Sequence, residues 1–492
     1  MPLTAGSIVA LDQGTTSTRA IRFGVDGSIL ASAARELPQH FPQAGWVEQD
    51  PEEIWAGTLH TLRAVIDDSV AAIGIANQRE TVILWDRETG RPLYNAIVWQ
   101  DRRTAGICAA MRDDGLEPII RQKTGLLLDP YFSATKLRWM LDHVDGARRR
   151  ADQGRLAAGT VDCFLVWQLT GGRVHATDVT NASRTMLYDI HRHCWDTDLL
   201  ALFDIPASVL PVVHGNAHIF GETDPALTGR SLPIAGMAGD QQAALIGQRC
   251  FEPGMVKSTY GTGCFLLAHT GAKPTLSDNR LLTTPAYRIG DEDAYALEGS
   301  IFIAGAAVKW LRDTLGLIVS AEDTARLAAS VPDDHGVHLV PAFVGLGAPH
   351  WRSDVRAAIS GMTLNTVPAH FARAALEAAA FQTGDLLDAM IADGGAAPTV
   401  VRIDGGMATN DWFVQCLADL TGVTVERPRH HEITAFGAAL LAGLTIGLWP
   451  DRNGPKQERK AIARFGPKLG ADKRAERRNA WQAALRRVLD SA

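Results

Sequence analysis

Two short segments carry the residue types that bind phosphate groups. The first covers residues 14–18 (GTTST) and is followed by Arg19, and the second covers residues 260–263 (YGTG). Small residues in a tight turn expose backbone N–H groups and hydroxyls, which donate to phosphate oxygens from several directions. Asp12, just before the first turn, has the carboxylate oxygens that Mg²⁺ prefers. Together the segments predict a phosphate and metal site, although a polar hairpin turn explains the first segment alone equally well.

Asp240 lies between a strand-like segment and a helical segment. It follows a short apolar run over residues 232–238 and precedes a helical pattern. A carboxylate in this place can cap a helix by accepting hydrogen bonds from its first backbone N–H groups. It can also act as a general base that accepts a hydroxyl proton during phosphoryl transfer, a role typically worth about 10²- to 10⁴-fold in rate. The residues alone leave both roles open.

Arg79 and Glu80 form an adjacent charged pair that interrupts apolar structure. They follow the strand-like run AAIGIANQ and precede a second apolar run. Buried charges need partners, so the two side chains must pair with each other, with other residues or with a polar ligand. A polyol would use both, because arginine donates to hydroxyl oxygens and a carboxylate accepts from hydroxyl hydrogens. An internal ion pair explains the two residues equally well.

The elements around these residues indicate an internal repeat. Each glycine-threonine turn lies between two apolar runs, which predicts a β-hairpin; the dinucleotide and Walker motifs, which join a strand to a helix, do not occur. Two such hairpins, about half a chain apart, predict related domains over residues 1–245 and 246–492, each contributing one turn to a shared site. A chance resemblance between two glycine-rich hairpins is the alternative. The alternating helix and strand patterns between them favour layered α/β domains.

Composition excludes several classes of protein. With 46% hydrophobic and 21% charged residues in 492, the chain has the make-up of a folded globular protein, and a net charge of −7 argues against a dedicated nucleic-acid binder. Its six cysteines include no CxxC pair, which predicts a reducing cytoplasmic environment. The uncharged stretch 433–449 is expected to be a buried helix rather than a membrane span. The basic segment 472–489 is expected to be a packed terminal helix with its charges in solvent.

Segments from about residue 7 to about residue 450 closely resemble the FGGY family of carbohydrate kinases, and within it the glycerol kinases. They include IVALDQGTTSTRA, GIANQRET, DPYFSATKLRWMLDH, AGDQQAALIGQ, STYGTGCF, ALEGSIFIAGAAVKWLRD, PAFVGLGAPHW and VRIDGGMATND. The resemblance implies an α/β protein in which two actin/ribonuclease H-like domains flank a deep cleft. The N-terminal domain would bind the substrate and the phosphates, and the C-terminal domain the nucleotide.

The resemblance also implies an activity and the residues that perform it. ATP, with Mg²⁺, would phosphorylate a terminal hydroxyl of glycerol to give sn-glycerol 3-phosphate, in a cytoplasmic homodimer or homotetramer that neither enters a membrane nor binds nucleic acid. The implied glycerol contacts are Arg79, Glu80, Tyr131, Asp240, Gln241 and Phe265, with Trp99 as a further apolar wall. Asp240 would be the general base and Asp12 the Mg²⁺ ligand. The implied ATP contacts are Thr15, Thr16, Ser17, Arg19 and Thr262 at the phosphates, and Gly305, Lys309, Gly406 and Asn410 at the sugar and base.

The sequence departs from the family pattern at a few positions. Lys309 stands where glutamine is expected, so its role at the nucleotide is open. The segment 224–233 lacks the basic, glycine-rich loop that binds fructose 1,6-bisphosphate in some relatives, and has Ala226 where others carry a phosphorylated histidine. We therefore expect neither form of regulation. Two other functions stay open at this point: an FGGY kinase for another polyol or a ketose, and an actin-like ATPase.

Overall fold

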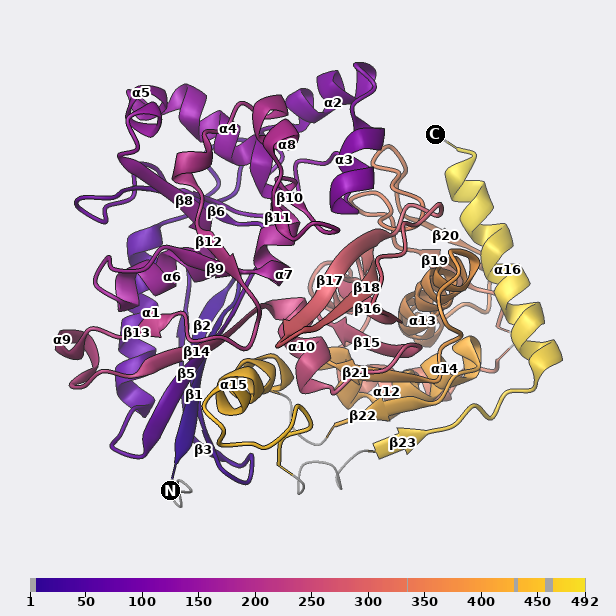
Figure 1. Cartoon of the computed structure of the whole chain (residues 1–492). Helices are drawn as coiled ribbons and strands as arrows, with labels where there is room; N and C mark the ends of the chain where they lie inside the picture. Colours follow the sequence, from indigo (N-terminus) through magenta and orange to yellow (C-terminus); the bar gives the residue numbers. More distant parts are fainter. Residues whose placement is uncertain (1–5, 334, 429–431, 456–462, 492) are drawn as a thin grey trace.

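Two large β-sheets form the frame of the protein (Figure 1). The computed structural model describes residues 6–333, 335–428, 432–455 and 463–491. The first sheet has the strand order β13-β14-β5-β1-β2-β3 and the second the order β17-β18-β16-β15-β21-β22-β23. The first contains β1 (Ser7–Gln13), β2 (Ser17–Gly24), β3 (Ile29–Glu36), β5 (Val70–Asn77), β13 (Gly221–Glu222) and β14 (Pro233–Gly239). The second contains β15 (Met255–Tyr260), β16 (Cys264–Gly271), β17 (Leu282–Ile289), β18 (Glu292–Ile301), β21 (Val400–Asp404), β22 (Val425–Arg427) and β23 (Ala463–Phe465).

The two sheets repeat one topology. In the first, β1 pairs antiparallel with β2 and parallel with β5. In the second, β15 pairs antiparallel with β16 and parallel with β21. Each glycine-threonine turn joins the antiparallel pair of its own sheet, so both predicted hairpins are confirmed. The shared topology also supports the internal repeat over the alternative of a chance resemblance between two turns.

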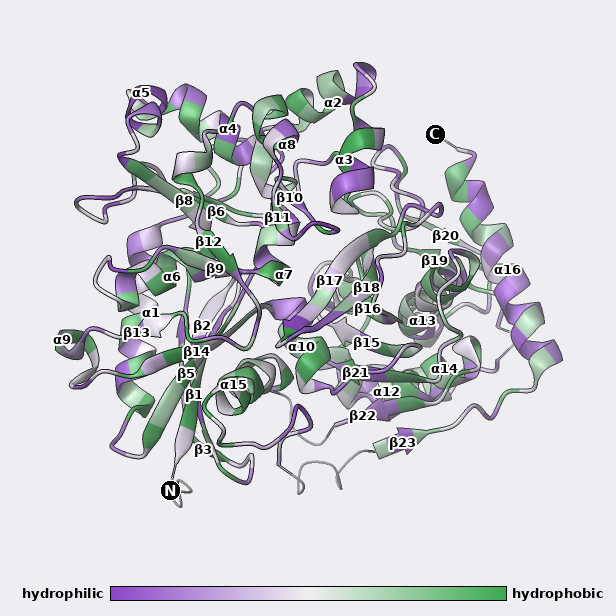
Figure 2. Ribbon diagram, in the orientation of Figure 1, coloured by the Kyte–Doolittle hydropathy of each residue, from purple (hydrophilic) through white to green (hydrophobic). Residues whose placement is uncertain are grey.

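Helices cover both faces of the first sheet because the side chains of a strand alternate between its faces. Val9 and Leu11 of β1 pack with α1 (Pro51–Val65) and α6 (Val161–Leu169). Ile8 and Ala10 of the same strand pack with α10 (Asp240–Gly247) and α15 (Ile433–Thr445). Figure 2 shows hydrophobic residues along β1, β5 and α15. A helix from the second half of the sequence therefore completes the core of the first sheet.

Glycines let α15 pack very closely against β5 and α10. A Cβ atom on Gly74 of β5 would lie 2.2 Å from the Ala438 carbonyl oxygen, and one on Gly437 would lie 1.8 Å from that of Ala243. Only glycine fits at such contacts with backbone. The expectation that the uncharged stretch forms a buried helix is confirmed for α15. Among the helices of the described residues, none has the length and hydropathy needed to span a lipid bilayer.

The second sheet packs against helices that include the chain's C-terminal helix. These are α11 (Gly305–Asp313), α12 (Asp323–Ala329), α13 (Pro368–Ala392), α14 (Asp411–Thr421) and α16 (Ala471–Leu489). In α16, Trp481, Leu485 and Val488 are buried against α13, whereas the helix as a whole alternates between hydrophobic and hydrophilic residues (Figure 2). Arg478 pairs with Asp388 of α13. The prediction of a packed terminal helix is confirmed, but not all of its charges lie in solvent, because Arg477 and Arg478 are mostly buried and pair with acidic residues of α13.

Smaller elements complete the first half of the chain. A four-stranded sheet contains β4 (Glu48–Gln49), β6 (Val82–Asp86), β7 (Ala96–Ile97) and β8 (Leu156–Thr160), near α2 (Ala105–Asp113), α3 (Glu117–Thr124), α4 (Ser133–His143) and α5 (Ala147–Asp152). Short elements follow: β9 (Ala176–Asp178), α7 (Val179–Ala182), η1 (Ser183–Thr185), β10 (Tyr188–Asp189), β11 (Cys194–Trp195), α8 (Thr197–Leu202), η2 (Ala207–Val209), β12 (Val212–His214) and α9 (Pro225–Thr228). In the second half, β19 (His338–Val340) pairs with β20 (Ala358–Ser360), while η3 (Gly406–Thr409) follows β21.

Candidate active site

Asp12 and Asp240 bring two carboxylates together at the first sheet. Asp12 lies near the end of β1, opposite Arg19 on β2, and Asp240 is the first residue of the helix that follows β14. Burial and the nearby Asp240 carboxylate raise the pKa of Asp12 to about 7, while Arg19 opposes the rise. A divalent cation would relieve the repulsion between two such carboxylates, because hard cations take oxygen ligands. The donor set at Asp12 therefore fits Mg²⁺.

The first glycine-threonine turn is tied to its surroundings at Thr15. Its hydroxyl accepts a hydrogen bond from Trp99 Nε1 at 2.9 Å, and its carbonyl accepts one from Gln49 Nε2 at 2.5 Å. Thr16, next in the turn, is exposed, and Ser17 is half-buried. Arg19 is also exposed and pairs with Glu432, the residue before α15, at 3.0 Å. The turn thus holds its backbone firmly while it presents hydroxyl groups to solvent.

The second turn is bonded directly to the start of α11. The backbone N–H groups of Ala304 and Ala306 donate to the Thr262 carbonyl at 2.9 and 3.0 Å, and that of Gly305 donates to Gly261 at 3.0 Å. A Cβ atom on Gly305 would lie 2.6 Å from the Gly261 oxygen, so the close approach requires glycine. The structure therefore places Thr262 beside Gly305, as two residues of one nucleotide site would be. Lys309 lies one turn further along α11 and is exposed.

Gly406 and Asn410 lie where β21 ends, beside the end of β15. Gly405 has φ 90°, and a Cβ atom there would lie 2.4 Å from the Tyr260 carbonyl oxygen, which packs this corner closely against the strand before the second turn. Gly406 is exposed, with open space where a Cβ would be. Asn410 caps α14, because its Oδ1 accepts from the Phe413 N–H at 3.1 Å. This contact gives Asn410 a structural role whether or not it meets a nucleotide.

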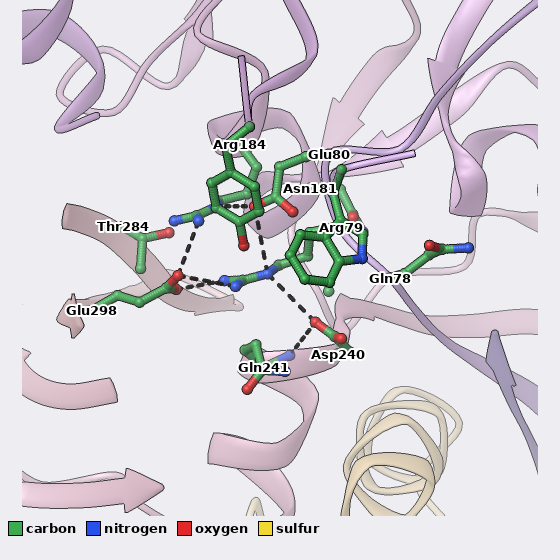
Figure 3. Close-up of polar contacts among 12 residues, drawn as sticks. Gln78, Arg79, Glu80, Asn181, Arg184, Asp240, Gln241, Thr284 and Glu298 are labelled. Carbon is green, nitrogen blue, oxygen red and sulfur yellow. Dashed lines mark hydrogen bonds and ion pairs between the residues drawn. The ribbon is translucent and has the colours of Figure 1, made fainter. Parts of the chain in front are cut away.

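Arg79 and Glu80 belong to a buried ring of four charges (Figure 3). Arg79 Nη1 and Nη2 donate to the two oxygens of Glu298 at 2.6 and 3.0 Å. Arg184 Nη2 donates to Glu298 Oε1 at 3.0 Å, and its Nε donates to Glu80 Oε1 at 2.5 Å. All four residues are at most 2% exposed. The direct contact between the Arg79 and Glu80 side chains, 3.8 Å, is the longest in the ring, so the expected internal pair is only its closing link.

Asp240 meets this ring from the side of the first sheet. Its Oδ1 lies 3.4 Å from Arg79 Nε and accepts from the Gln241 N–H at 2.7 Å. Burial raises the pKa of Asp240, while Arg79 and Lys257 oppose the rise. Gly239 occupies the N-cap position of α10, but Asp240, the first residue of the helix, still accepts the Gln241 N–H, so the helix-capping role stays open beside that of a base. Its carboxylate is left partly accessible, with 29% of the side chain exposed.

Aromatic rings and a buried lysine complete the surroundings. The Trp99 ring lies edge-on to Tyr131 and Phe265, with centroids 5.6 and 6.1 Å away. Lys257 Nζ donates to Gln241 Oε1 at 2.5 Å. Tyr131 meets the charge ring through Arg184, whose guanidinium carbon lies 5.5 Å from the centre of its ring. Gln241 contacts Asp240, and Lys257 donates to the Phe265 carbonyl at 3.5 Å.

Reasoning from the sequence missed the partners of these residues. Glu298 and Lys257 are charges inside apolar strand runs, the same signal that singles out Arg79 and Glu80, and they could have been found by it. Arg184 lies in a short polar stretch, TNASRT, and has no comparable signal.

Family models cover most of the chain. One for the N-terminal domain of the FGGY family of carbohydrate kinases matches residues 7–247, and one for its C-terminal domain matches residues 256–446. The chain belongs to this family. The predicted two-domain α/β fold is confirmed as the FGGY kinase fold, whereas the division at residue 245 stays a prediction.

FGGY relatives resemble the chain over nearly its whole length. A glycerol kinase of Gluconobacter oxydans is 56% identical, with 98% of this chain and 95% of the relative covered. A glycerol kinase of Methylobacterium nodulans is 57% identical, with 97% of each covered. Among solved structures, the glycerol kinase of Plasmodium falciparum with ADP has a TM-score of 0.94 at 38% identity, covering 99% of this chain and 98% of that one. A xylulose kinase of Lactobacillus acidophilus, at 22% identity and a TM-score of 0.90 over 99% of both chains, shares the fold.

Proposed function

We propose that this protein transfers the γ-phosphoryl group of ATP to a terminal hydroxyl of glycerol, giving sn-glycerol 3-phosphate and ADP. The proposal rests on the position of Arg79, which contacts both Asp240 and Glu80. These contacts bring a candidate base next to a pair of residues that can bind a polyol. Identities of 54–57% to proteins named glycerol kinase support the choice of acceptor.

The polyol would bind through groups that the ring leaves unused. Glu80 Oε1 accepts from Arg184, and Oε2 has no hydrogen bond to any residue that the structure describes, so it can accept from a hydroxyl. Arg79 Nε lies 3.4 Å from Asp240 Oδ1, and both atoms could bond a hydroxyl that lies beside this contact, Arg79 as donor and Asp240 as acceptor. Tyr131, Trp99 and Phe265 would cover the carbon chain, and Gln241 would lie beside the reacting end. A site that pairs every hydroxyl strongly rejects an acceptor that lacks one.

Asp240 would accept the proton of the attacking hydroxyl as the new P–O bond forms. Its partial exposure lets an acceptor reach it, while Arg79 and Lys257 favour the ionised form that a base requires. Thr15, Thr16, Ser17, Arg19 and Thr262 would bind the phosphates, and Gly305, Lys309, Gly406 and Asn410 the sugar and base. Asp12 would hold Mg²⁺, which when bound neutralises charge on the phosphates.

The cellular setting is also a proposal. All six cysteines are unpaired, as expected in a reducing compartment such as the cytoplasm. We further propose that the protein forms a homodimer or homotetramer, as the resemblance to the family implies.

The test is an ADP-release assay with ATP and Mg²⁺ across glycerol, dihydroxyacetone, xylulose, ribulose, erythritol and no acceptor. We expect strong stimulation by glycerol and recovery of glycerol 3-phosphate. Stronger stimulation by another acceptor would reassign the pocket to a different polyol or ketose. ADP release that ignores every acceptor would replace the proposal with the ATPase function.

A further inference from the structure

The charge ring joins residues from both large sheets. Arg79 and Glu80 follow β5 of the first sheet, and Arg184 lies in η1. Glu298 lies on β18 of the second sheet, and in Figure 3 its carboxylate meets both guanidinium groups from the side opposite Asp240. Two arginines and two glutamates balance in charge, so no net charge is buried. The ring is therefore a direct polar link between the sheets at the polyol-binding pair.

Glu298 is the strongest partner of Arg79. The two hydrogen bonds between them form a bidentate pair, the arrangement that fixes both the position and the plane of a guanidinium. The remaining anionic contacts of Arg79, with Asp240 and Glu80, are longer at 3.4 and 3.8 Å. Without the Glu298 charge, Arg79 would turn toward those two carboxylates, because a buried cation cannot remain unpaired. The groups that should meet the substrate would then be occupied by each other.

Glu298 also acts on Glu80, through Arg184. The Arg184 guanidinium lies between the two carboxylates and bonds one oxygen of each. The backbone of Glu80 has φ 60°, a conformation that residues other than glycine rarely adopt, so the surrounding contacts must maintain it. Although burial opposes ionisation, Arg184 and Arg79 lower the pKa of Glu298 to about 2, so it keeps its charge at every working pH.

The strand of Glu298 leads to the candidate nucleotide site. At the end of β18, Ile301 pairs with Cys264, just after the second glycine-threonine turn. Gly305, bonded to that turn, lies seven residues after Glu298 in the chain. Glu298, the anchor of Arg79, therefore lies on the strand that leads directly into α11, where Gly305 and Lys309 are proposed to meet the nucleotide.

We propose that Glu298 is a positioning residue for polyol recognition, through which the second domain sets the geometry of a binding pair that belongs to the first. It holds Arg79 directly and Glu80 through Arg184, and leaves their remaining polar atoms free for the acceptor. The inference rests on the proposed binding of glycerol by Arg79 and Glu80.

The test compares Glu298→Gln and Glu298→Asp with a control in a similar buried network. The control is Glu377, a buried residue of α13 outside the ring. It accepts from Arg373 and Arg477 and pairs with His335. We expect Glu298→Gln to raise KM for glycerol at least about tenfold while KM for ATP changes less than about threefold. Glu298→Asp, which keeps the charge, should recover part of the loss. Glu377→Gln should lower the Tm and leave both KM values near wild type.

Equal KM values for glycerol in Glu298→Gln and wild type would overturn the inference, since Glu298 would then serve only stability. If Glu298→Gln does not fold, Glu298→Asp and Arg184→Lys decide, because each keeps the charge balance and shifts the ring; unchanged glycerol KM in both would also overturn it. Arg79→Ala separates a failure of the proposed polyol site from a failure of the positioning role of Glu298. If Arg79→Ala leaves glycerol KM unchanged, the proposed polyol site is wrong, whereas a raised KM there and unchanged values in the other variants refute the positioning role alone.

Discussion

Replacing Asp240 with asparagine isolates the proposed base from its structural surroundings. The amide oxygen can still accept the Gln241 N–H, which lies 2.7 Å from Oδ1, so the start of α10 keeps its local contact. Arg79 loses an ion pair of 3.4 Å but retains the bidentate pair with Glu298. Because the Asp240 side chain is 29% exposed, water compensates much of that loss. We expect the free energy of unfolding to change by about 1 kcal/mol or less.

The effect on turnover should be far larger. An amide cannot accept the hydroxyl proton, and loss of a general base typically costs about 10²- to 10⁴-fold in rate. At 1.36 kcal/mol per tenfold, this equals about 2.7 to 5.4 kcal/mol of activation free energy. The activation barrier should therefore rise by more than the stability falls, which separates chemistry from folding.

The assay measures ADP release at saturating glycerol and ATP, together with ATP affinity and urea denaturation. Asp385→Asn is the matched control. Asp385 lies on α13, where its carboxylate accepts from Trp481 Nε1 of α16 at 2.7 Å, and it contacts none of the candidate site residues that the structure describes. That variant should lose stability and keep its kcat. A kcat within about threefold of wild type for Asp240→Asn would refute the base, and weakened ATP binding of the same size as the loss in kcat would attribute the effect to the nucleotide.

Three further predictions address other parts of the protein. Burial, with the nearby Asp178 carboxylate, raises the pKa of Asp162 to about 7 in the folded protein, so the wild type gains stability as the pH falls from 8 to 5. The Asp162→Asn variant lacks this gain. Urea denaturation should therefore find the variant's free energy of unfolding, relative to wild type, highest at pH 8 and lower at pH 5. Gly437→Ala should lower the Tm, since its Cβ would lie 1.8 Å from a backbone oxygen, whereas Gly106→Ala in α2, where nothing lies within 4 Å, should raise it slightly. Fructose 1,6-bisphosphate should leave activity unchanged, because the segment 224–233 lacks the basic, glycine-rich loop; a sizeable change in activity would contradict this prediction.

Local patterns were sufficient for the parts of the fold that depend on neighbours in sequence. The two hairpins follow from apolar runs around glycine-threonine turns, and the buried α15 follows from an uncharged stretch of alanine, glycine and leucine. The amphipathic α16 follows from the spacing of Trp481, Leu485 and Val488. Each of these signals lies within about twenty residues, the range over which strand and helix periodicity can be observed.

The candidate site could be predicted only in part, for a related reason. Arg79 and Glu80 are visible as charges inside apolar runs, and the family resemblance supplies roles for the turns and for Asp240. That Arg79 is held by Glu298, 219 residues later, and Glu80 by Arg184 is visible only in three dimensions. No periodicity links such distant positions.

The sequence by itself predicted two related α/β domains, the resemblance to the FGGY kinases and the residues expected at the site. Tertiary structure alone decided which charges pair, that α15 completes the core of the first sheet, and that Glu298 of the second sheet anchors an arginine of the first. The physical reason is that local patterns specify which surfaces must be buried, whereas buried charges find their partners only after the elements have packed.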